Sequence, residues 1–197
     1  AHELAAQTTD LSLDENHVFR AVEAVHKRCR GGYAAVTMIP GFGVVAFRDP
    51  NGIRPLVFGV RDGGDAPEMM VASESVALDT LDFDRVRDVD PGEAIIMTFS
   101  GDLHTRQCAE SPQRSPCIFE FVYFARPDSV IDNIFVHKAR LRMGKRLARK
   151  VQRELGKSKV DVVIPIPDTS RTSAMSLAHV LGVRFTEGFI KNRYIGR

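Results

Sequence analysis

A polar stretch late in the sequence, Asp168–Arg171, has side chains that could bind an anion. It follows the apolar run VVIPI (162–166) and precedes a segment in which Ala, Met, Leu and Val recur at helical spacing. The pattern predicts a strand, a turn and the start of a helix. Asp168, Thr169 or Ser170 can cap that helix, and backbone N–H groups at a helix N-terminus attract phosphate. The turn carries no GxxxxGK(S/T) motif, so it is not a P-loop. We predict an anion site here, although a single cap more often serves structure alone.

Other residues that could carry chemistry form no recognisable catalytic or metal-binding pattern. The three cysteines, Cys29, Cys108 and Cys117, are too widely spaced for a disulfide framework or a paired CxxC metal site. Glu74 and Asp79 could form a carboxylate pair, but a solvated or capping role is favoured for both. No serine, threonine or cysteine of the first half stands in a recognisable nucleophile context. The sequence therefore predicts a scaffold in this half, without a catalytic centre.

The distribution of charge predicts two domains. The net charge of +2 divides into −7 for residues 1–117, with 11 basic and 18 acidic side chains, and +9 for residues 118–197, with 16 and 7. The turn-forming stretch SPQRSP (111–116) marks the same boundary. No run of 18 apolar residues is present, the first residues do not form a secretory signal, and cysteine is scarce, so a cytoplasmic location is favoured.

In the first half, the apolar pattern predicts one helix followed by a meander of strands. Residues 14–30 have apolar positions at helical spacing, acidic residues first and basic residues last. Short apolar runs between turn residues predict strands over 33–39, 43–49, 55–62, 69–75 and 92–99. Several of these runs are apolar on both faces, which indicates a covered sheet. RDPNGIRPL (48–56) is expected to form a tight hairpin, with Asn51 and Gly52 at positive φ.

In the second half, residues 136–155 read as a basic amphipathic helix. Met143, Leu147, Val151 and Leu155 recur every four residues and predict a single stripe facing the core. A solvated outer face, which can also meet the acidic domain, is favoured over binding to nucleic acid or to a membrane surface. This face carries eight cations: Lys138, Arg140, Arg142, Lys145, Arg146, Arg149, Lys150 and Arg153.

A series of longer sequence blocks, in order along nearly the whole chain, resembles one enzyme family. They are RDPNGIRPL, ASESVALD (72–79), PGEAI (91–95), TRQCA (105–109), CIFEFVYFARPDS (117–129), VVIPIPDTS (162–170) and KNRYIGR (191–197). Together they resemble the glutamine phosphoribosylpyrophosphate amidotransferases, also called amidophosphoribosyltransferases. The resemblance implies an enzyme of purine synthesis, in which ammonia from glutamine displaces pyrophosphate from phosphoribosyl pyrophosphate to give 5-phosphoribosylamine.

The resemblance implies an α+β and α/β fold in two parts. Residues 1–117 would be the C-terminal portion of a glutaminase domain, an N-terminal-nucleophile αββα sandwich. Residues 118–197 would be the first portion of a type I phosphoribosyltransferase domain with a parallel sheet. The family further implies a cytoplasmic homo-oligomer, Mg²⁺ that arrives with phosphoribosyl pyrophosphate, and purine nucleotides as inhibitors, but no nucleic-acid or membrane partner.

The resemblance also assigns expected site residues. Ser170 is the first choice for a contact with phosphate or its Mg²⁺, and Tyr123 and Arg126 are expected between the domains, near the path of ammonia. Cys117 would ligate an iron–sulfur cluster only if the protein carried one, and a buried thiol is favoured instead. The expected substrate-binding residues are Asp168, Thr169, Ser170, Lys191, Arg193, Tyr194 and Arg197.

Two parts of the family's machinery are not found in this sequence. The family's nucleophile is a cysteine at the mature N-terminus, and its substrate motif contains two adjacent aspartates, which occur nowhere here. We therefore expect an internal fragment that has no catalytic residue of its own and is inactive alone. Two alternatives stay open: another class II glutamine amidotransferase, such as one that aminates a sugar phosphate, and a catalytically dead regulatory or nucleotide-binding module.

Overall fold

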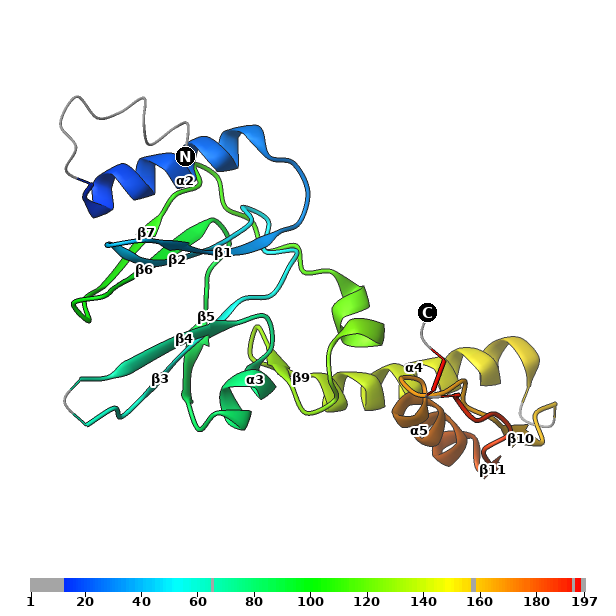
Figure 1. The fold of residues 1–197 in the computed structure, drawn as a ribbon. Coiled ribbons are helices and arrows are strands. Elements are labelled where there is room, and N and C mark those ends of the chain that lie inside the picture. The colour runs from blue at the N-terminus through cyan, green and yellow to red at the C-terminus, as the bar shows by residue number, and fades with distance from the viewer. Residues whose placement is uncertain (1–12, 65, 157–158, 193, 196–197) are drawn as a thin grey trace. The chain divides into compact units, whose positions relative to one another are not determined.

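The structure, a computed structural model, describes residues 13–64, 66–156, 159–192 and 194–195, which belong to two compact units (Figure 1). The first unit contains Ala1–Cys117 and Val130–Asn133, and the second contains Ile118–Ser129 and Ile134–Arg197. The chain thus passes from one unit to the other between residues 117 and 118, and Val130–Asn133 returns to the first. Among the described residues, no helix combines the length and the apolar character needed to cross a bilayer.

The first helix among the described residues is α2 (Glu15–Arg28), which confirms the helix predicted over 14–30. Asp14 is its N-cap, and its carboxylate accepts the backbone N–H of His17 at 2.8 Å. The buried side chains of α2, Val18, Phe19 and Val22, pack against Val45, Ala94 and Ile96 of the sheet below.

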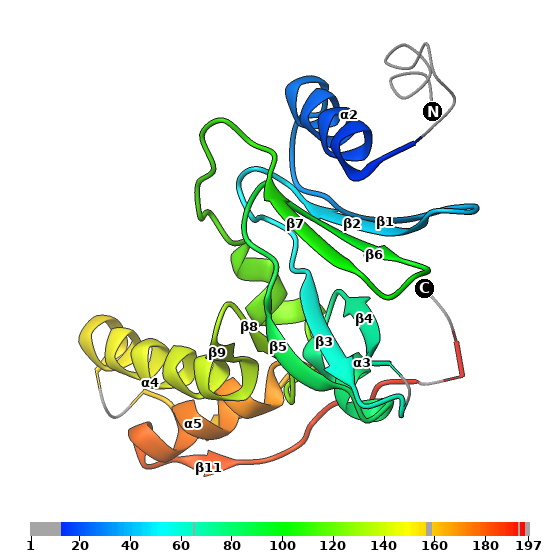
Figure 2. The same ribbon diagram turned by 90° about the vertical axis from the view of Figure 1, so that its left-hand side faces the viewer.

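Two antiparallel sheets follow, stacked in the order α2, sheet, sheet, α3 among the described residues of this unit (Figures 1 and 2). The first sheet has the order β1 (Ala34–Ile39), β2 (Gly43–Arg48), β6 (Glu93–Thr98) and β7 (Leu103–Gln107). The second has the order β4 (Glu68–Ala72), β3 (Val57–Arg61) and β5 (Asp84–Asp88), and is followed by α3 (Ser75–Thr80). Alternate residues of β2 and β6 face α2 or the second sheet, which explains why these strands are apolar on both faces.

The segment RDPNGIRPL does not form the predicted hairpin. Strand β2, which precedes it, pairs with β1 and β6, whereas strand β3, which follows it, pairs with β4 and β5. The segment is therefore a crossover between two sheets, and only Gly52 has a positive φ, of 58°. The dipeptide Asn51-Gly52 is typical of hairpins, but the strands on its two sides pair with other strands and not with each other.

The second unit contains a short π-helix (Glu120–Phe124), the strand β9 (Ile134–Phe135) and a β–α–β crossover. Strand β8 (Val130–Ile131), which precedes β9 in the chain, lies in the segment that returns to the first unit. After helix α4 (Val136–Leu155), strand β10 (Val162–Val163) leads into α5 (Arg171–Leu181), and β11 (Arg184–Phe185) pairs parallel to β10. The strand, turn and helix predicted around Asp168 are therefore confirmed. Helix α5 ends at Gly182, whose φ of 71° is left-handed.

The predicted core stripe of α4 is wrong by one helical position. Leu147 and Leu155 are 47% and 50% exposed. The buried face consists instead of Val136, Arg140, Gly144 and Ala148. Small residues lie in the middle of this face because α5 packs there at close range: a Cβ on Gly144 would lie 2.2 Å from the carbonyl oxygen of Ser173.

Arg140 does not belong to the solvated outer face on which it was expected. It is 3% exposed, and its Nε and Nη2 donate to the carbonyls of Phe121 and Ala125, each at 2.7 Å. This buried guanidinium therefore ties α4 to the π-helix of the same unit.

Candidate functional site

The predicted anion turn lies between β10 and α5, at the helix N-terminus. Ser170 is the N-cap residue of α5, and Arg171 is its first helical residue. The backbone N–H of Ala174 donates to the Ser170 carbonyl at 2.8 Å, so the helix is regular from its first turn. The first amides of a helix have no partner within it and give this end a partial positive charge. The backbone of the turn is thus suited to an anion.

No side chain caps α5 in the way that was predicted. Ser170 has helical φ and ψ of −77° and −15°, and its side chain makes no capping hydrogen bond. Its hydroxyl instead donates to the carbonyl oxygen of Ile166, within the same turn. The oxygen lone pairs of Ser170 therefore stay free to accept a bond.

Charged side chains surround the turn in a mixed arrangement. Arg171 lies 3.3 Å from a carboxylate oxygen of Glu187 and 3.9 Å from one of Asp168. All three side chains are between 38% and 49% exposed. A bound phosphate would have to share Arg171 with two carboxylates, whereas a divalent cation could use Asp168 directly.

The described residues at the turn suit a Mg²⁺ ion only as part of its ligand set. Mg²⁺ prefers six oxygen ligands and usually keeps waters and substrate phosphates among them. Within the described ranges, no group of three or more His, Cys, Asp or Glu side chains could enclose a metal ion. Asp168 and Ser170 together offer one carboxylate and one hydroxyl oxygen. This donor set fits an ion that arrives with a phosphorylated substrate.

The expected residues of the final segment are only partly described. Lys191 is exposed and Tyr194 is 100% exposed, while Arg193 and Arg197 lie outside the described residues. The backbone N–H of Tyr194 donates to the side-chain oxygen of Asn192 at 3.0 Å. Within the described part of the chain, no hydrogen bond or ion pair joins Lys191 or the Tyr194 side chain to the turn at Asp168. The substrate-binding role of this segment stays a prediction.

Tyr123 and Arg126 each make contacts close to them in sequence. The Tyr123 ring, 38% exposed, meets Phe124 edge-on at a centroid distance of 5.6 Å. Arg126 donates from Nε and Nη2 to the two carboxylate oxygens of Asp128, at 3.1 and 2.9 Å. This hydrogen bond lowers the pKa of the Asp128 carboxyl from its usual range. Their expected place between domains stays a prediction.

The three cysteines differ in exposure. Cys29 is exposed and Cys117 is half-buried. Cys108 is buried at the end of β7, beside a cavity of about 330 Å³ whose lining includes Lys27 and Glu110. Burial raises the pKa of the Cys108 thiol to about 12, so the thiolate is scarce at neutral pH.

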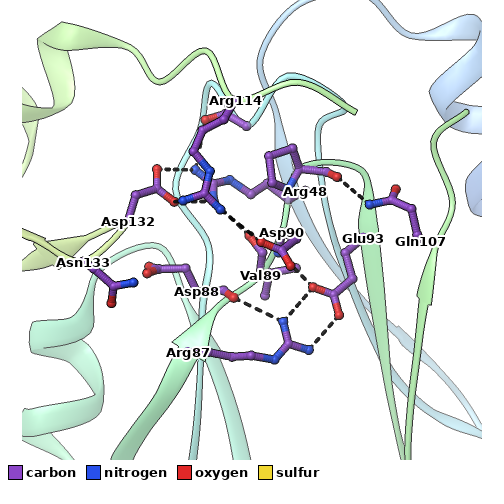
Figure 3. A network of polar contacts seen from close by, with 12 residues as sticks. Arg48, Arg87, Asp88, Val89, Asp90, Glu93, Gln107, Arg114, Asp132 and Asn133 are labelled. Carbon is purple, nitrogen blue, oxygen red and sulfur yellow. Dashed lines mark hydrogen bonds and ion pairs between the residues drawn. The ribbon is translucent and has the colours of Figure 1, made fainter. Parts of the chain in front are cut away.

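The sequence did not predict the polar network that surrounds Arg48 in the first unit (Figure 3). Arg48 is 1% exposed, and its guanidinium meets the Asp132 carboxylate through two hydrogen bonds of 3.0 and 3.1 Å. Its remaining N–H groups donate to the carbonyls of Gly52, Arg54 and Val89 at 2.7–2.9 Å. The arginine therefore has a partner for each of its donor nitrogens.

The neighbouring residue, Asp49, organises the same loop through its backbone. It is fully buried, at 0% exposure. Its carboxylate accepts four backbone N–H groups at 3.0–3.3 Å, those of Tyr33, Asn51, Ile53 and Arg54. Together, Arg48 and Asp49 hold the crossover between the two sheets in one conformation. The only sequence signal for this role was the block RDPNGIRPL itself.

We expect the free energy of unfolding to fall as the pH decreases below about 6.5, because of His26. His26 is 8% exposed, lies 2.7 Å from the Tyr33 hydroxyl and packs edge-on against Phe47. Burial lowers its pKa below the usual 6.5, so the folded state favours the neutral ring. This stabilisation is complete above pH 6.5 and is lost as the pH falls through the lowered pKa.

Urea denaturation between about pH 7.5 and pH 5 measures this effect. His26→Gln cannot titrate and keeps a polar partner for Tyr33, so it should lose stability less steeply with acid than the wild type. His137→Gln, at an exposed histidine, is the matched control and should keep the wild-type slope. Equal slopes for His26→Gln and the wild type would show that His26 does not cause the effect.

Comparisons with known proteins give a consistent result, although no model of a protein family matches the chain. The chain is 60% identical over 197 residues to the amidophosphoribosyltransferase of Pseudomonas aeruginosa. The match includes 100% of this chain but only 39% of that protein. It is 57% identical over 186 residues to the enzyme of Escherichia coli and 48% identical over 189 residues to that of Saccharomyces cerevisiae, with 94% of the chain and 37% of each relative covered.

Solved structures of the same enzyme share the fold. The glutamine phosphoribosylpyrophosphate amidotransferase from B. subtilis, complexed with ADP and GMP, matches with a TM-score of 0.80 and 34% identity over 100% of this chain and 39% of that one. A structure described as the allosteric regulatory enzyme of purine biosynthesis matches with the same score and identity, over 38% of its length. By sequence and by fold, the chain corresponds over its whole length to a segment of the amidophosphoribosyltransferases.

Proposed function

We propose that this chain forms part of an amidophosphoribosyltransferase, which uses ammonia from glutamine to displace pyrophosphate from phosphoribosyl pyrophosphate. The product would be 5-phosphoribosylamine, at the start of purine synthesis. The observation that carries the proposal is 60% identity to the Pseudomonas aeruginosa enzyme along all 197 residues. Identity that spans both units argues against an amidotransferase that shares only the glutaminase half.

Within this proposal, the two units have different tasks. The layered first unit is a portion of the glutaminase domain, with the N-terminal-nucleophile fold. The second unit is a portion of the phosphoribosyltransferase domain, and its turn at Asp168–Ser170 contacts the phosphates of the substrate together with Mg²⁺. The β–α–β crossover supports this assignment, because ligands of parallel sheets bind where the strands end and helix N-termini begin.

The proposal extends to setting and partners. The protein would act in the cytoplasm as a homo-oligomer, would need no iron–sulfur cluster, and would be inhibited by purine nucleotides. The structure of the B. subtilis relative with ADP and GMP supports the last point. Tyr123 and Arg126 would lie near the path of ammonia, and Lys191, Arg193, Tyr194 and Arg197 would take part in substrate binding.

A labelled-nitrogen assay on the intact protein tests the proposed function. With glutamine labelled at its amide nitrogen, phosphoribosyl pyrophosphate and Mg²⁺, we expect glutamate, pyrophosphate and a labelled amine to form together. Chelation of Mg²⁺ should stop pyrophosphate release. We expect the 197-residue chain alone to release no glutamate.

Two results would contradict the proposal. Amine transfer to a sugar phosphate but not to phosphoribosyl pyrophosphate would favour another class II amidotransferase. Binding of purine nucleotides without glutamate or pyrophosphate release would favour a regulatory module.

A further inference from the structure

A four-residue segment links the two units in an unusual way. Val130–Asn133 belongs to the first unit, although the chain on either side of it, up to Ser129 and from Ile134, belongs to the second. The segment therefore makes its contacts mainly with the first unit, although its neighbours in sequence belong to the second.

The segment ends in a turn whose backbone is set in the left-handed region. Asp132 and Asn133 have φ values of 47° and 61° and connect β8 to β9. Two consecutive positive φ values are typical of two-residue hairpin turns, and residues other than glycine adopt them at an energetic cost. Contacts of the side chains must offset that cost.

Both side chains of the turn accept hydrogen bonds from arginines of the first unit, and Figure 3 shows those between Asp132 and Arg48. The Asp132 carboxylate, 4% exposed, accepts two hydrogen bonds from Arg48. The side-chain oxygen of Asn133 accepts one from Arg85 at 3.2 Å. Just before the turn, the backbone N–H of Val130 donates to the buried Ser75 hydroxyl at 2.9 Å. The turn is thus held by hydrogen bonds from Arg48 and Arg85 and, just before it, by one to Ser75. We call these three residues the polar socket of the turn.

Arg48 is the residue of this socket that lies farthest from solvent, so water cannot take over its hydrogen bonds to Asp132. Its other donors already serve three carbonyls, and its side chain is 1% exposed. If Arg48 were neutral and apolar, the buried Asp132 carboxylate would lose its main counter-charge, and the turn would leave the socket to reach water. Arg48 therefore makes the closest charged contacts of the turn, since the Nη1 atom of Arg114 lies farther from the Asp132 carboxylate, at 3.8 Å.

The held turn lies directly before the helices of the second unit. Helix α4 begins at Val136, three residues after Asn133. Two serines of α5 fasten it to α4: the hydroxyls of Ser173 and Ser176 donate to the carbonyls of Arg140 and Leu141 at 3.0 and 2.9 Å. Helix α5 in turn carries the Asp168–Ser170 turn at its N-terminus.

We propose that Arg48 is a positioning residue that acts through Asp132: by holding the turn it fixes where the chain enters α4, and so couples glutamine hydrolysis to amine transfer. This role rests on the proposed function. The buried Arg48 side chain has protein partners for all of its donor nitrogens, so the role assigned to it is positional. We expect each half-reaction to run without the turn being held. The turn is needed for a different step, in which ammonia released by glutamine hydrolysis is used in amine transfer.

The intact protein carrying Arg48→Met tests this proposal, with Arg87→Met as the matched control. Arg87 donates to both carboxylate oxygens of Glu93, at 2.6 and 2.7 Å, and Glu93 is 7% exposed. Both variants therefore leave a buried carboxylate without its arginine, but only Arg48→Met releases the turn. Asp132→Asn, which keeps the size of the side chain, takes the place of Arg48→Met if that variant does not fold.

The decisive measurement is the ratio of glutamate to pyrophosphate formed from glutamine. In Arg48→Met we expect this ratio to rise about threefold or more, while glutamine hydrolysis and ammonia-supported pyrophosphate release each stay within about twofold of the wild type. Arg87→Met should keep the wild-type ratio. Equal ratios in the two variants would overturn the proposal, because a general loss of stability would affect both alike.

Amide hydrogen exchange gives a second readout that needs no activity. The N–H groups of Val130 and Val136 should exchange about tenfold faster in Arg48→Met than in Arg87→Met. If the wild type performed neither half-reaction, the proposed function would fail, and this exchange would still decide whether Arg48 holds the turn. Unchanged exchange at Val130 would show that it does not.

Discussion

Gly144→Ala will lower the free energy of unfolding of the second unit by about 3 kcal/mol. The added Cβ would lie 2.2 Å from the Ser173 carbonyl oxygen and 2.8 Å from the Ser176 Cβ. The first of these atoms belongs to the backbone and cannot rotate away, so α4 and α5 must separate. By helix propensity alone, alanine would stabilise the helix by about 1 kcal/mol. We therefore expect the substitution to destabilise the unit although helix propensity alone would predict stabilisation.

Urea denaturation followed by helical circular dichroism measures this change. Arg149→Ala, on the exposed face of α4, is the control and should shift the stability by no more than about 0.5 kcal/mol. A Gly144→Ala protein as stable as the wild type would mean that the two helices are not as close as the structure shows. Ser173 and Ser176, which bind α4, lie on α5, and the candidate substrate turn lies at the N-terminus of that helix. We therefore expect the separation of α4 and α5 in Gly144→Ala to displace the turn as well.

Asp49→Ala will cost the first unit about 4 kcal/mol of stability, the second large effect. The substitution removes the acceptor of four backbone N–H groups in a site with 0% exposure. Each buried N–H without a partner costs about 1–3 kcal/mol, and relaxation of the loop recovers part of the sum. Asp49→Asn should cost less, about 2 kcal/mol, because its amide oxygen still accepts.

A matched control exists at another turn of the same unit. Asp62 is exposed, and within the described residues its carboxylate accepts one backbone N–H, that of Gly64, at 3.0 Å. Asp62→Ala should therefore change the free energy of unfolding by about 0.5 kcal/mol or less. If Asp49→Ala cost no more than Asp62→Ala, the four hydrogen bonds would not be what holds the crossover.

Apolar periodicity predicted the buried elements and failed for the polar ones. Strands β2 and β6 are apolar on both faces, and α2 has a clear stripe, so their positions follow from the sequence. Strands β5 (DRVRD) and β7 (LHTRQ) each contain a single apolar residue, the others being charged or polar, and were not predicted. Their burial is partial, and their pairing with β3 and β6 is what makes them strands. Helix α3, of six residues, is too short to show a period.

The wrong prediction for α4 shows that a buried helix face made of small residues is not detected by a search for large apolar residues at helical spacing. Every fourth residue from Val136 through Arg140 and Gly144 to Ala148 is buried, yet only the first is large and apolar. Helix α5 can approach this face closely because Gly144 and Ala148 have small or no side chains. Arg140 can be buried there because its guanidinium donates to two backbone carbonyls. A glycine and an alanine four residues apart in an otherwise basic helix are the signal that could have revealed this contact.

The candidate site was predictable only in part, for a physical reason. The turn at Asp168–Ser170 is local, so strand, turn and helix signals located it. The Arg48 network joins residues up to 84 positions apart, and no local pattern records such a pairing. The sequence block around Arg48 resembled a family, but the structure was needed to show that Arg48 and Asp49 shape the loop and that Asp132 completes it.

The late position of Asp132 also affects how the protein is made. A ribosome adds about 5–20 residues per second, so on the order of 4–17 s pass between the synthesis of Arg48 and that of its partner, 84 residues later. In that interval the nascent first unit has a guanidinium without its counter-ion, and Ile118–Ser129 is translated before Val130–Asn133 can complete the unit. We therefore expect the first unit to reach its full stability on the ribosome only after residue 133 has left the exit tunnel.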